Sequence, residues 1–193
     1  MGLEIELKYA ATAQAQTAVM AAYPGPWQTI RMETTYNDTP EGSLSQRWYT
    51  LRRRLENEAS VCTIKPPVDG LGRGEWEVLC QDIHLAIPEL CKLGCPADLL
   101  ALTAGGAIPG CGARFPRQAL TIRFRDSVLE LALDSGVLFG GSREIPLCEI
   151  EVELKEGSEE AAVRFAGKLA RDFGLTPEHR SKIARARALA DEA

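Results

Sequence analysis

The sequence lacks any run of about 20 apolar residues, the length that a membrane-spanning helix requires, so we expect no transmembrane helix and no membrane partner. Glu4, Glu6 and Lys8 interrupt the region where an apolar signal core would lie, which predicts that no secretory signal is present. Histidine is also scarce. With only His84 and His179 in the chain, a histidine-based acid–base mechanism is a poor explanation of any activity.

An excess of positive charge is missing as well, because 27 acidic residues outnumber 22 basic ones and the net charge is −5. Proteins that coat nucleic acid usually carry a basic surface, so we expect no nucleic-acid partner. Among the basic residues only six are lysine and 16 are arginine. The planar arginine fork suits phosphate and carboxylate groups, which favours an anionic small molecule as ligand.

Six cysteines without a secretory signal are typical of free thiols in a reducing compartment, and we predict a cytoplasmic protein. Cys91 and Cys95, together with Cys111, have a spacing that could suggest zinc, but no fourth ligand is evident in the sequence. Ordinary thiols are the simpler interpretation.

Strict alternation of apolar and polar residues predicts about eight β-strands. They cover residues 3–9, 30–37, 48–55, 59–65, 74–80, 120–125, 127–134 and 148–155. Helices are predicted at residues 12–22, 83–93, 97–102 and 158–173, and from about residue 177 to the terminus. No linker or repeat divides the chain. We therefore predict one α+β domain over residues 1–193, with an antiparallel sheet large enough to close or nearly close.

Charged side chains share one face of the predicted strands, while the opposite faces are apolar and need cover by helices or loops. The charged face carries Glu4, Glu6, Lys8, Arg52, Arg54, Arg117, Arg123, Arg125, Glu130, Asp134, Glu149, Glu151 and Glu153. One interpretation is an open sheet with a face in water. The segregation of acids and arginines by strand favours instead the polar interior of a barrel. Acids from the first and last strands would bind a hard divalent cation, and basic residues from the middle strands a polyanion.

The opening segment Glu4-Ile5-Glu6-Leu7-Lys8 resembles the Glu-x-Glu-x-Lys signature of the CYTH superfamily, the triphosphate tunnel metalloenzymes. Further matching segments follow in order: Tyr36 with Asp38-Thr39-Pro40, Leu51-Arg52-Arg53-Arg54, Thr63-Ile64-Lys65, Arg73 with Glu75, Arg117, Leu131-Ala132-Leu133-Asp134-Ser135-Gly136, Cys148-Glu149-Ile150-Glu151-Val152-Glu153-Leu154, and Ser181-Lys182. The arrangement is most similar to the bacterial triphosphatase branch.

The resemblance implies a closed, eight-stranded antiparallel β-barrel with a charged lumen, flanked by helices. It also implies residue roles. The implied ligands of Mg2+ or Mn2+ are Glu4, Glu6, Asp134, Glu149 and Glu151. The implied phosphate-binding residues are Lys8, Arg52, Arg54, Lys65, Arg73, Arg117 and Lys182, with Arg123 in second rank because it shares only the strand parity. Lys8, Glu151 and Glu153 are the catalytic candidates, and the choice between a carboxylate base and a metal-bound hydroxide stays open.

These features predict a metal-dependent hydrolase of short linear polyphosphates, foremost inorganic triphosphate cleaved to pyrophosphate and phosphate. A class IV-type adenylate cyclase and a non-catalytic polyphosphate- or nucleotide-binding module are the alternatives. No segment specifies adenine, and retention of the carboxylates argues against the module. The partner is a small polyphosphate or nucleoside triphosphate, and a homodimer is possible. Glu6→Gln or Glu151→Gln should abolish activity with little loss of folding, because each removes charge from a row of like charges.

Overall fold

The computed structural model describes residues 5–67 and 74–191. Its strands are β1 (Glu6–Ala10), β2 (Gln28–Asp38), β3 (Thr50–Glu56), β4 (Ala59–Lys65), β5 (Trp76–Leu79), β6 (Ile108–Phe124), β7 (Ser127–Gly140), β8 (Arg143–Glu156) and β9 (Thr176–Pro177). Its helices are α1 (Ala13–Ala22), α2 (Ser43–Gln46), α3 (Ile83–Lys92), α4 (Leu99–Leu102), α5 (Glu159–Phe173) and α6 (Lys182–Asp191). All eight predicted strands are present.

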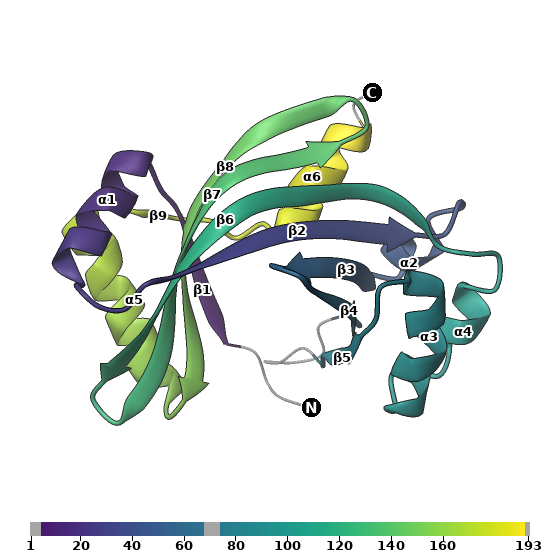
Figure 1. Ribbon diagram of the computed structural model, residues 1–193, viewed down its shortest axis with the longest axis horizontal. Coiled ribbons are helices and arrows are strands. Elements are labelled where there is room, and N and C mark those ends of the chain that lie inside the picture. Colours follow the sequence, from purple (N-terminus) through teal and green to yellow (C-terminus); the bar gives the residue numbers. More distant parts are fainter. Residues whose placement is uncertain (1–4, 68–73, 192–193) are drawn as a thin grey trace.

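The strands form one antiparallel sheet in the order β5-β4-β3-β2-β6-β7-β8-β1-β9. Long strands β2, β6, β7 and β8 build a strongly curved centre, and the shorter strands at both ends turn toward each other beneath it (Figure 1). The mixed α/β class is confirmed. In residues 5–67 and 74–191 no hydrogen-bonded ladder joins β5 to β1 or β9, so the predicted closed barrel is not confirmed.

The strand count also differs from the prediction, because a ninth strand lies where the last helix was expected to begin. Thr176 and Pro177 pair with Ala10 and Tyr9 of β1, and α6 starts only at Lys182. Proline tolerates this position because an edge strand leaves its missing N–H without a required partner. The short pairing therefore fixes the segment that leads into α6 alongside β1.

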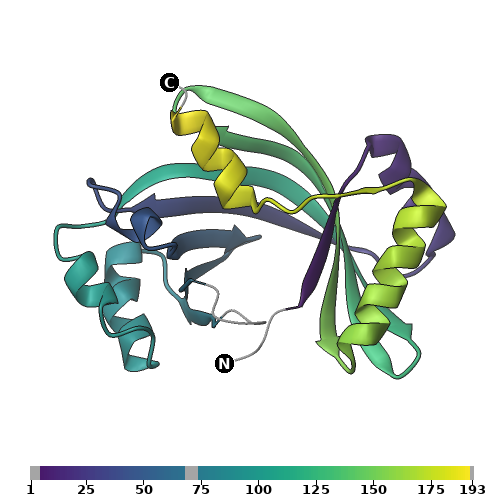
Figure 2. The ribbon, with the colours of Figure 1, turned by 180° about the vertical axis from the view of Figure 1, so that it is seen from behind.

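The apolar outer faces of the sheet are covered by helices, as predicted. Helices α1 and α5 pack over β1, β7 and β8, where Leu131 and Ile150 are buried against Phe165 and Leu169. At the other end, α3 and α4 pack over Leu51 of β3 and its neighbours on β4 (Figure 2). Burial of this kind contributes roughly 1.5–3 kcal/mol per large apolar side chain. The two clusters hold both ends of the curved sheet in place.

Local signals explain where the helices begin and end. The Thr12 hydroxyl accepts a hydrogen bond from the N–H of Ala15, and that of Ser158 accepts one from Ala161, so both residues act as N-caps. Gly174 ends α5 with a φ of +65°, a conformation that glycine adopts without steric cost. No helix of the described segments is long and apolar enough to cross a membrane.

Helix α6 lies inside the curve of the sheet rather than on its outside (Figures 1 and 2). Ile183, Ala186 and Leu189 pack against Phe115 of β6 and Leu138 of β7. The inner face is therefore only partly ionic. We expected the apolar residues of the sheet to point away from the lumen, and this is wrong for the part of the inner face that α6 covers. An amphipathic helix needs an apolar surface on which to pack.

Candidate active site

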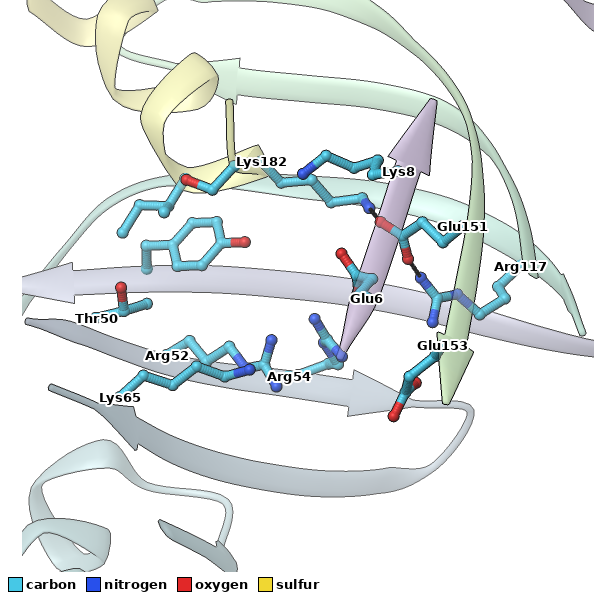
Figure 3. A pocket seen from close by; sticks show the side chains of 13 residues that line it. Glu6, Lys8, Thr50, Arg52, Arg54, Lys65, Arg117, Glu151, Glu153 and Lys182 are labelled. Carbon is cyan, nitrogen blue, oxygen red and sulfur yellow. Dashed lines mark hydrogen bonds and ion pairs between the residues drawn. The ribbon is translucent and has the colours of Figure 1, made fainter. Parts of the chain in front are cut away.

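A cavity of about 310 Å3 lies beneath the curve of the sheet, beside the first turn of α6. Its walls come from both ends of the sheet (Figure 3). The lining residues are Glu6, Lys8, Tyr36, Thr50, Arg52, Arg54, Lys65, Arg117, Glu151, Glu153, Ser181, Lys182 and Ile183. Nine of the predicted site residues are thus brought together around one space. Strand alternation explains this, because Glu6 and Lys8, like Arg52 and Arg54, are two residues apart.

Pairing between β1 and β8 sets the register of the acidic wall. Lys8 lies opposite Glu151, and Glu6 lies opposite Glu153. The facing acids Glu6 and Glu153 thus lie next to a lysine, which offsets the repulsion between like charges. The register places carboxylates of the first and last predicted strands side by side, as the charge pattern predicted.

Three acids meet at the buried edge of this wall. Asp134, Glu149 and Glu151 each contribute a carboxylate oxygen to a group whose members lie within 4.8 Å of one another. All three residues are buried, and Asp134 and Glu149 have no exposed surface. We call these residues the acidic triad. Charges buried in this way persist only when they are paired.

Basic side chains neutralise the acidic triad. Arg117 binds Asp134 through Nε–Oδ1 and Nη2–Oδ2 contacts of 2.8 Å each, and its Nη2 also contacts Glu151. Lys182 Nζ lies 3.0 Å from Asp134 Oδ2 and 2.7 Å from Glu149 Oε2, and it donates to Glu151. Arg185 Nη2 donates to Glu149. Three carboxylates therefore face three cations.

The pairing shifts the ionisation of its members. Burial alone would raise the pKa of Glu151, but Lys182 and Arg117 outweigh it and hold that pKa at about 2. Burial would lower the pKa of Lys182, yet the three acids raise it above its ordinary value. The pKa of Arg117 is raised for the same reason, chiefly by Asp134. All of these groups are ionised at neutral pH.

The opposite wall is basic, and its cations come from β3 and β4. Arg52 Nη2 and Lys65 Nζ each lie 3.1 Å from the same oxygen of Glu75. Arg54 Nε donates to the hydroxyl of Thr34 at 3.1 Å, and Arg54 Nη1 lies 3.7 Å from Oε1 of Glu56. Burial lowers the pKa of Arg54, and the positive charges of Arg52 and Arg117 lower it further. An anion in the cavity would relieve this repulsion.

Some predicted site residues are not brought into the cavity. Arg123 is exposed near the β6–β7 turn and does not line it. Asp134 and Glu149 lie behind the wall and reach the cavity only through the acidic triad. Glu4 and Arg73 fall outside the described residues.

Two residues that sequence reasoning missed support the acidic triad. Arg185 lies three positions after Lys182 on α6, so helical spacing places both on one face, and this spacing was an available signal. Gln16 of α1 is buried and its Nε2 donates to the backbone carbonyls of Asp134 and Glu149 at 2.9 Å each. No sequence signal distinguishes it from a surface glutamine.

The donor set fits a hard divalent cation. Carboxylate oxygens are the ligands that Mg2+ and Mn2+ prefer, and Glu6, Glu151 and Glu153 supply them at the cavity wall. The acidic triad adjoins them. Within it, the buried Oε2 of Glu149 faces a cation already, because Lys182 Nζ lies 2.7 Å from it. The carboxylates are thus compatible with a bound metal ion.

Comparisons with known proteins identify the family of the chain. Residues 2–186 match the CYTH domain family. The inorganic triphosphatase of Haemophilus influenzae is 30% identical over 135 residues, which cover 68% of this chain and 38% of that protein. The chain therefore spans well under half the length of this relative.

Solved structures share the fold at low sequence identity. A Hippeastrum protein studied as an adenylyl cyclase, with a dominant triphosphatase activity, superposes with a TM-score of 0.66, 18% identity, and 98% and 97% of the two chains covered. A candidate adenylate cyclase from Bacillus halodurans gives a TM-score of 0.62 at 18% identity, with 95% and 96% covered. At this level of identity the likeness supports the fold alone.

Proposed function

The chain belongs to the CYTH family, and from this premise we propose that it is a metal-dependent hydrolase that cleaves inorganic triphosphate to pyrophosphate and phosphate. The observation that carries the proposal is the cavity in which a basic wall faces an acidic wall. A linear polyphosphate with a bound divalent cation satisfies both walls together. The triphosphatase relative from Haemophilus influenzae supports the same chemistry.

The shape and lining of the cavity favour a compact anion over a nucleotide. Its volume of about 310 Å3 is close to the lower limit of ligand pockets, roughly 300 Å3. Tyr36 and Ile183 are its only large apolar lining residues among those described, and neither is accompanied by a second ring that could enclose a purine. A cyclase would have to bind adenine as well as phosphate. The proposed substrate is therefore a phosphate chain without a base.

The basic residues of the cavity are proposed to hold the phosphates. Lys8 and Lys182 approach from the acidic wall, while Arg52, Arg54 and Lys65 approach from the other. Fixed cations on both sides stabilise the charge that develops on the transferring phosphoryl group. Burial and the positive charges of Arg52 and Arg117 lower the pKa of Arg54, and a bound anion would offset both effects, so we assign Arg54 the largest share of anion binding. Arg73 and Glu4 stay predictions, and Arg123 is no longer proposed.

The carboxylates proposed to hold Mg2+ or Mn2+ are Glu6 and Glu151 at the cavity wall and Asp134 and Glu149 behind it. When bound, such an ion neutralises phosphate oxygens and polarises the group that is attacked. The pKa of about 2 makes Glu151 a weak base. Glu153 lines the same cavity, is more exposed and contacts Lys155 at 2.7 Å. We therefore assign proton acceptance from the attacking water to Glu153 rather than to Glu151.

Phosphate release from inorganic triphosphate, ATP and thiamine triphosphate, each with Mg2+ or Mn2+, tests the proposal. We expect triphosphate to give the highest kcat/KM. Arg54→Ala should lower that value by about 100-fold, in line with the removal of one charge-stabilising group. The neighbouring Arg53 is the matched control because its Nε contacts Ser60 outside the cavity, so Arg53→Ala should stay within about twofold of the parent.

Other outcomes separate the alternatives. Conversion of ATP to cyclic AMP at an equal or greater rate would assign the chain to the cyclases. Tight triphosphate binding with no turnover under any metal would favour a non-catalytic binding module. Equal losses in Arg54→Ala and Arg53→Ala would contradict the assignment of the cavity as the substrate site.

A further inference from the structure

We infer that Lys182 and a divalent cation compete for one position in the acidic triad. Metal binding at this position therefore requires the Lys182 side chain to move out of it. The inference rests on the metal requirement of the proposed function. It concerns a residue that the family resemblance assigns only to phosphate binding. The evidence is the position of the Lys182 ammonium among the three carboxylates.

Lys182 is the only described cation that contacts all three acids of the triad. Its Nζ lies 3.0 Å from Asp134 Oδ2 and 2.7 Å from Glu149 Oε2, and it donates to Glu151. Each arginine contacts only part of the triad: Arg117 binds Asp134 at two points and also contacts Glu151, and Arg185 donates to Glu149. A lysine ammonium is a compact point charge on a flexible stem, whereas an arginine fork is rigid. Lys182 is therefore the cation that can exchange.

The dimensions of the triad suit an ammonium and would have to change for a metal ion. Nitrogen-to-oxygen distances of 2.7 and 3.0 Å surround Lys182 Nζ. Oxygen ligands bind Mg2+ at about 2.0–2.1 Å, so each carboxylate would have to move inward by roughly 0.6–1 Å. Two like charges cannot share that smaller space in a buried site, where their repulsion is weakly screened. The lysine and the metal ion are thus mutually exclusive.

The burial of Glu149 means that the lysine can leave only in exchange for another cation. Glu149 has no exposed surface, and two cations offset its charge, Lys182 Nζ at 2.7 Å from Oε2 and Arg185, which donates to Oε1. A buried carboxylate that loses such a partner is left with an uncompensated charge. A divalent ion that replaces the ammonium keeps Glu149 compensated.

Displacement of Lys182 would also prepare the cavity for its substrate. Lys182 already lines the cavity, so its released ammonium faces the space proposed for the phosphates. The acidic triad and its three cations are neutral in total, and replacing one ammonium by a divalent ion leaves the triad positive. Metal and polyphosphate should consequently bind with positive coupling, each tightening the other.

Electron paramagnetic resonance of the free ion measures Mn2+ binding without any substrate. It therefore tests whether the metal ion replaces Lys182 independently of catalysis. In Lys182→Met the competing ammonium is gone, and we expect Mn2+ to bind at least tenfold more tightly than to the parent protein. Lys168→Met is the matched control, because Lys168 is exposed on α5 and pairs with Asp172. Its Mn2+ affinity should match that of the parent. Equal or weaker Mn2+ binding in Lys182→Met would overturn the inference.

A measurement on the unmodified chain covers the case in which Lys182→Met does not fold. Saturation with diamagnetic Mg2+ should shift the side-chain 15Nζ NMR signal of Lys182 toward that of an exposed lysine, while the signal of Lys168 stays unchanged. A Lys182 signal that does not shift at saturating Mg2+ would contradict the inference. Because neither measurement uses triphosphate, a chain that binds Mn2+ as expected but hydrolyses nothing refutes the proposed function alone.

Discussion

At the scale of single residues, Glu151 is both a wall of the cavity and a member of a buried ionic group. Its carboxylate lies between Arg117 and Lys182, and each is itself largely buried. The sequence showed a row of like charges on one strand and suggested that neutralising Glu151 would relieve repulsion. The structure replaces that expectation, because the neighbours of this carboxylate in space are cations. Its loss should destabilise the fold.

Glu151→Gln should lower the free energy of unfolding by about 3 kcal/mol at pH 7, because removing one partner leaves buried cations without compensation. The folded-state pKa of about 2 lies below the ordinary value of 4.5. The stabilisation is therefore fully present above about pH 4.5 and is lost as the pH falls toward 2. Urea unfolding at several pH values should show the difference between parent and variant shrinking over that interval.

Glu156→Gln is the control for this prediction, since Glu156 is exposed at the end of the same strand. Its unfolding free energy should follow that of the parent protein at every pH. A Glu151→Gln protein as stable as this control would mean that the ionic contacts of the triad contribute nothing to folding.

Residue-level prediction from the sequence succeeded where strand alternation carries the information. Glu6, Lys8, Arg52 and Arg54 follow from period two alone, and all four line the cavity. Arg123 has the same parity as Arg117, but parity does not say how far along a 17-residue strand the cavity extends. Parity determines which face of the strand a residue lies on but not its position along the strand. For this reason the sequence could not show which charged residues of that face line the cavity.

At the scale of elements, α6 determines how much of the inner face of the sheet is open. Its close approach depends on Gly140 at the end of β7, where an added Cβ would lie 2.2 Å from the carbonyl oxygen of Ala186. The sequence predicted a final helix but not its position inside the curve. The apolar residues Ile183, Ala186 and Leu189 follow one another at three-residue intervals. This spacing is equally compatible with packing on the outside of a sheet.

Gly140→Ala should destabilise the protein by about 1–3 kcal/mol, because backbone atoms of α6 cannot yield as a flexible side chain would. Urea denaturation measures this as a lower midpoint with an unchanged slope. Gly105→Ala is the matched control, since a Cβ there meets nothing within 4 Å. Equal midpoints for the two variants would show that α6 is not held against β7 as closely as the structure indicates.

At the scale of the whole molecule, the strands and their charged faces were predicted from the sequence, whereas the predicted closure of the sheet into a barrel is not confirmed. Closure depends on whether β5 reaches β1, and that distance is set by the curvature of β2, β6, β7 and β8 rather than by local pattern. The apolar clusters on the outside hold each end separately. The two ends of the sheet meet around the cavity, where charged side chains from one end face those from the other.

A ligand that bridges the two ends should therefore stabilise the molecule as a whole. Inorganic triphosphate would join Lys8 on β1 to Arg52 and Lys65 on β3 and β4. At about 100 times its Kd, a ligand of the folded state adds about 2.7 kcal/mol to the free energy of unfolding. This corresponds to a rise in Tm of about 5–10 °C for a chain of this size.

Calorimetry with triphosphate and no divalent ion measures the rise in Tm, with sulfate at equal ionic strength as the control. Arg54→Ala should lose most of the rise, since it removes a guanidinium that lines the cavity, whereas Arg53→Ala should keep it. If sulfate raised Tm as much as triphosphate does, the stabilisation would come from general screening of the basic wall and not from a phosphate chain spanning both ends of the sheet.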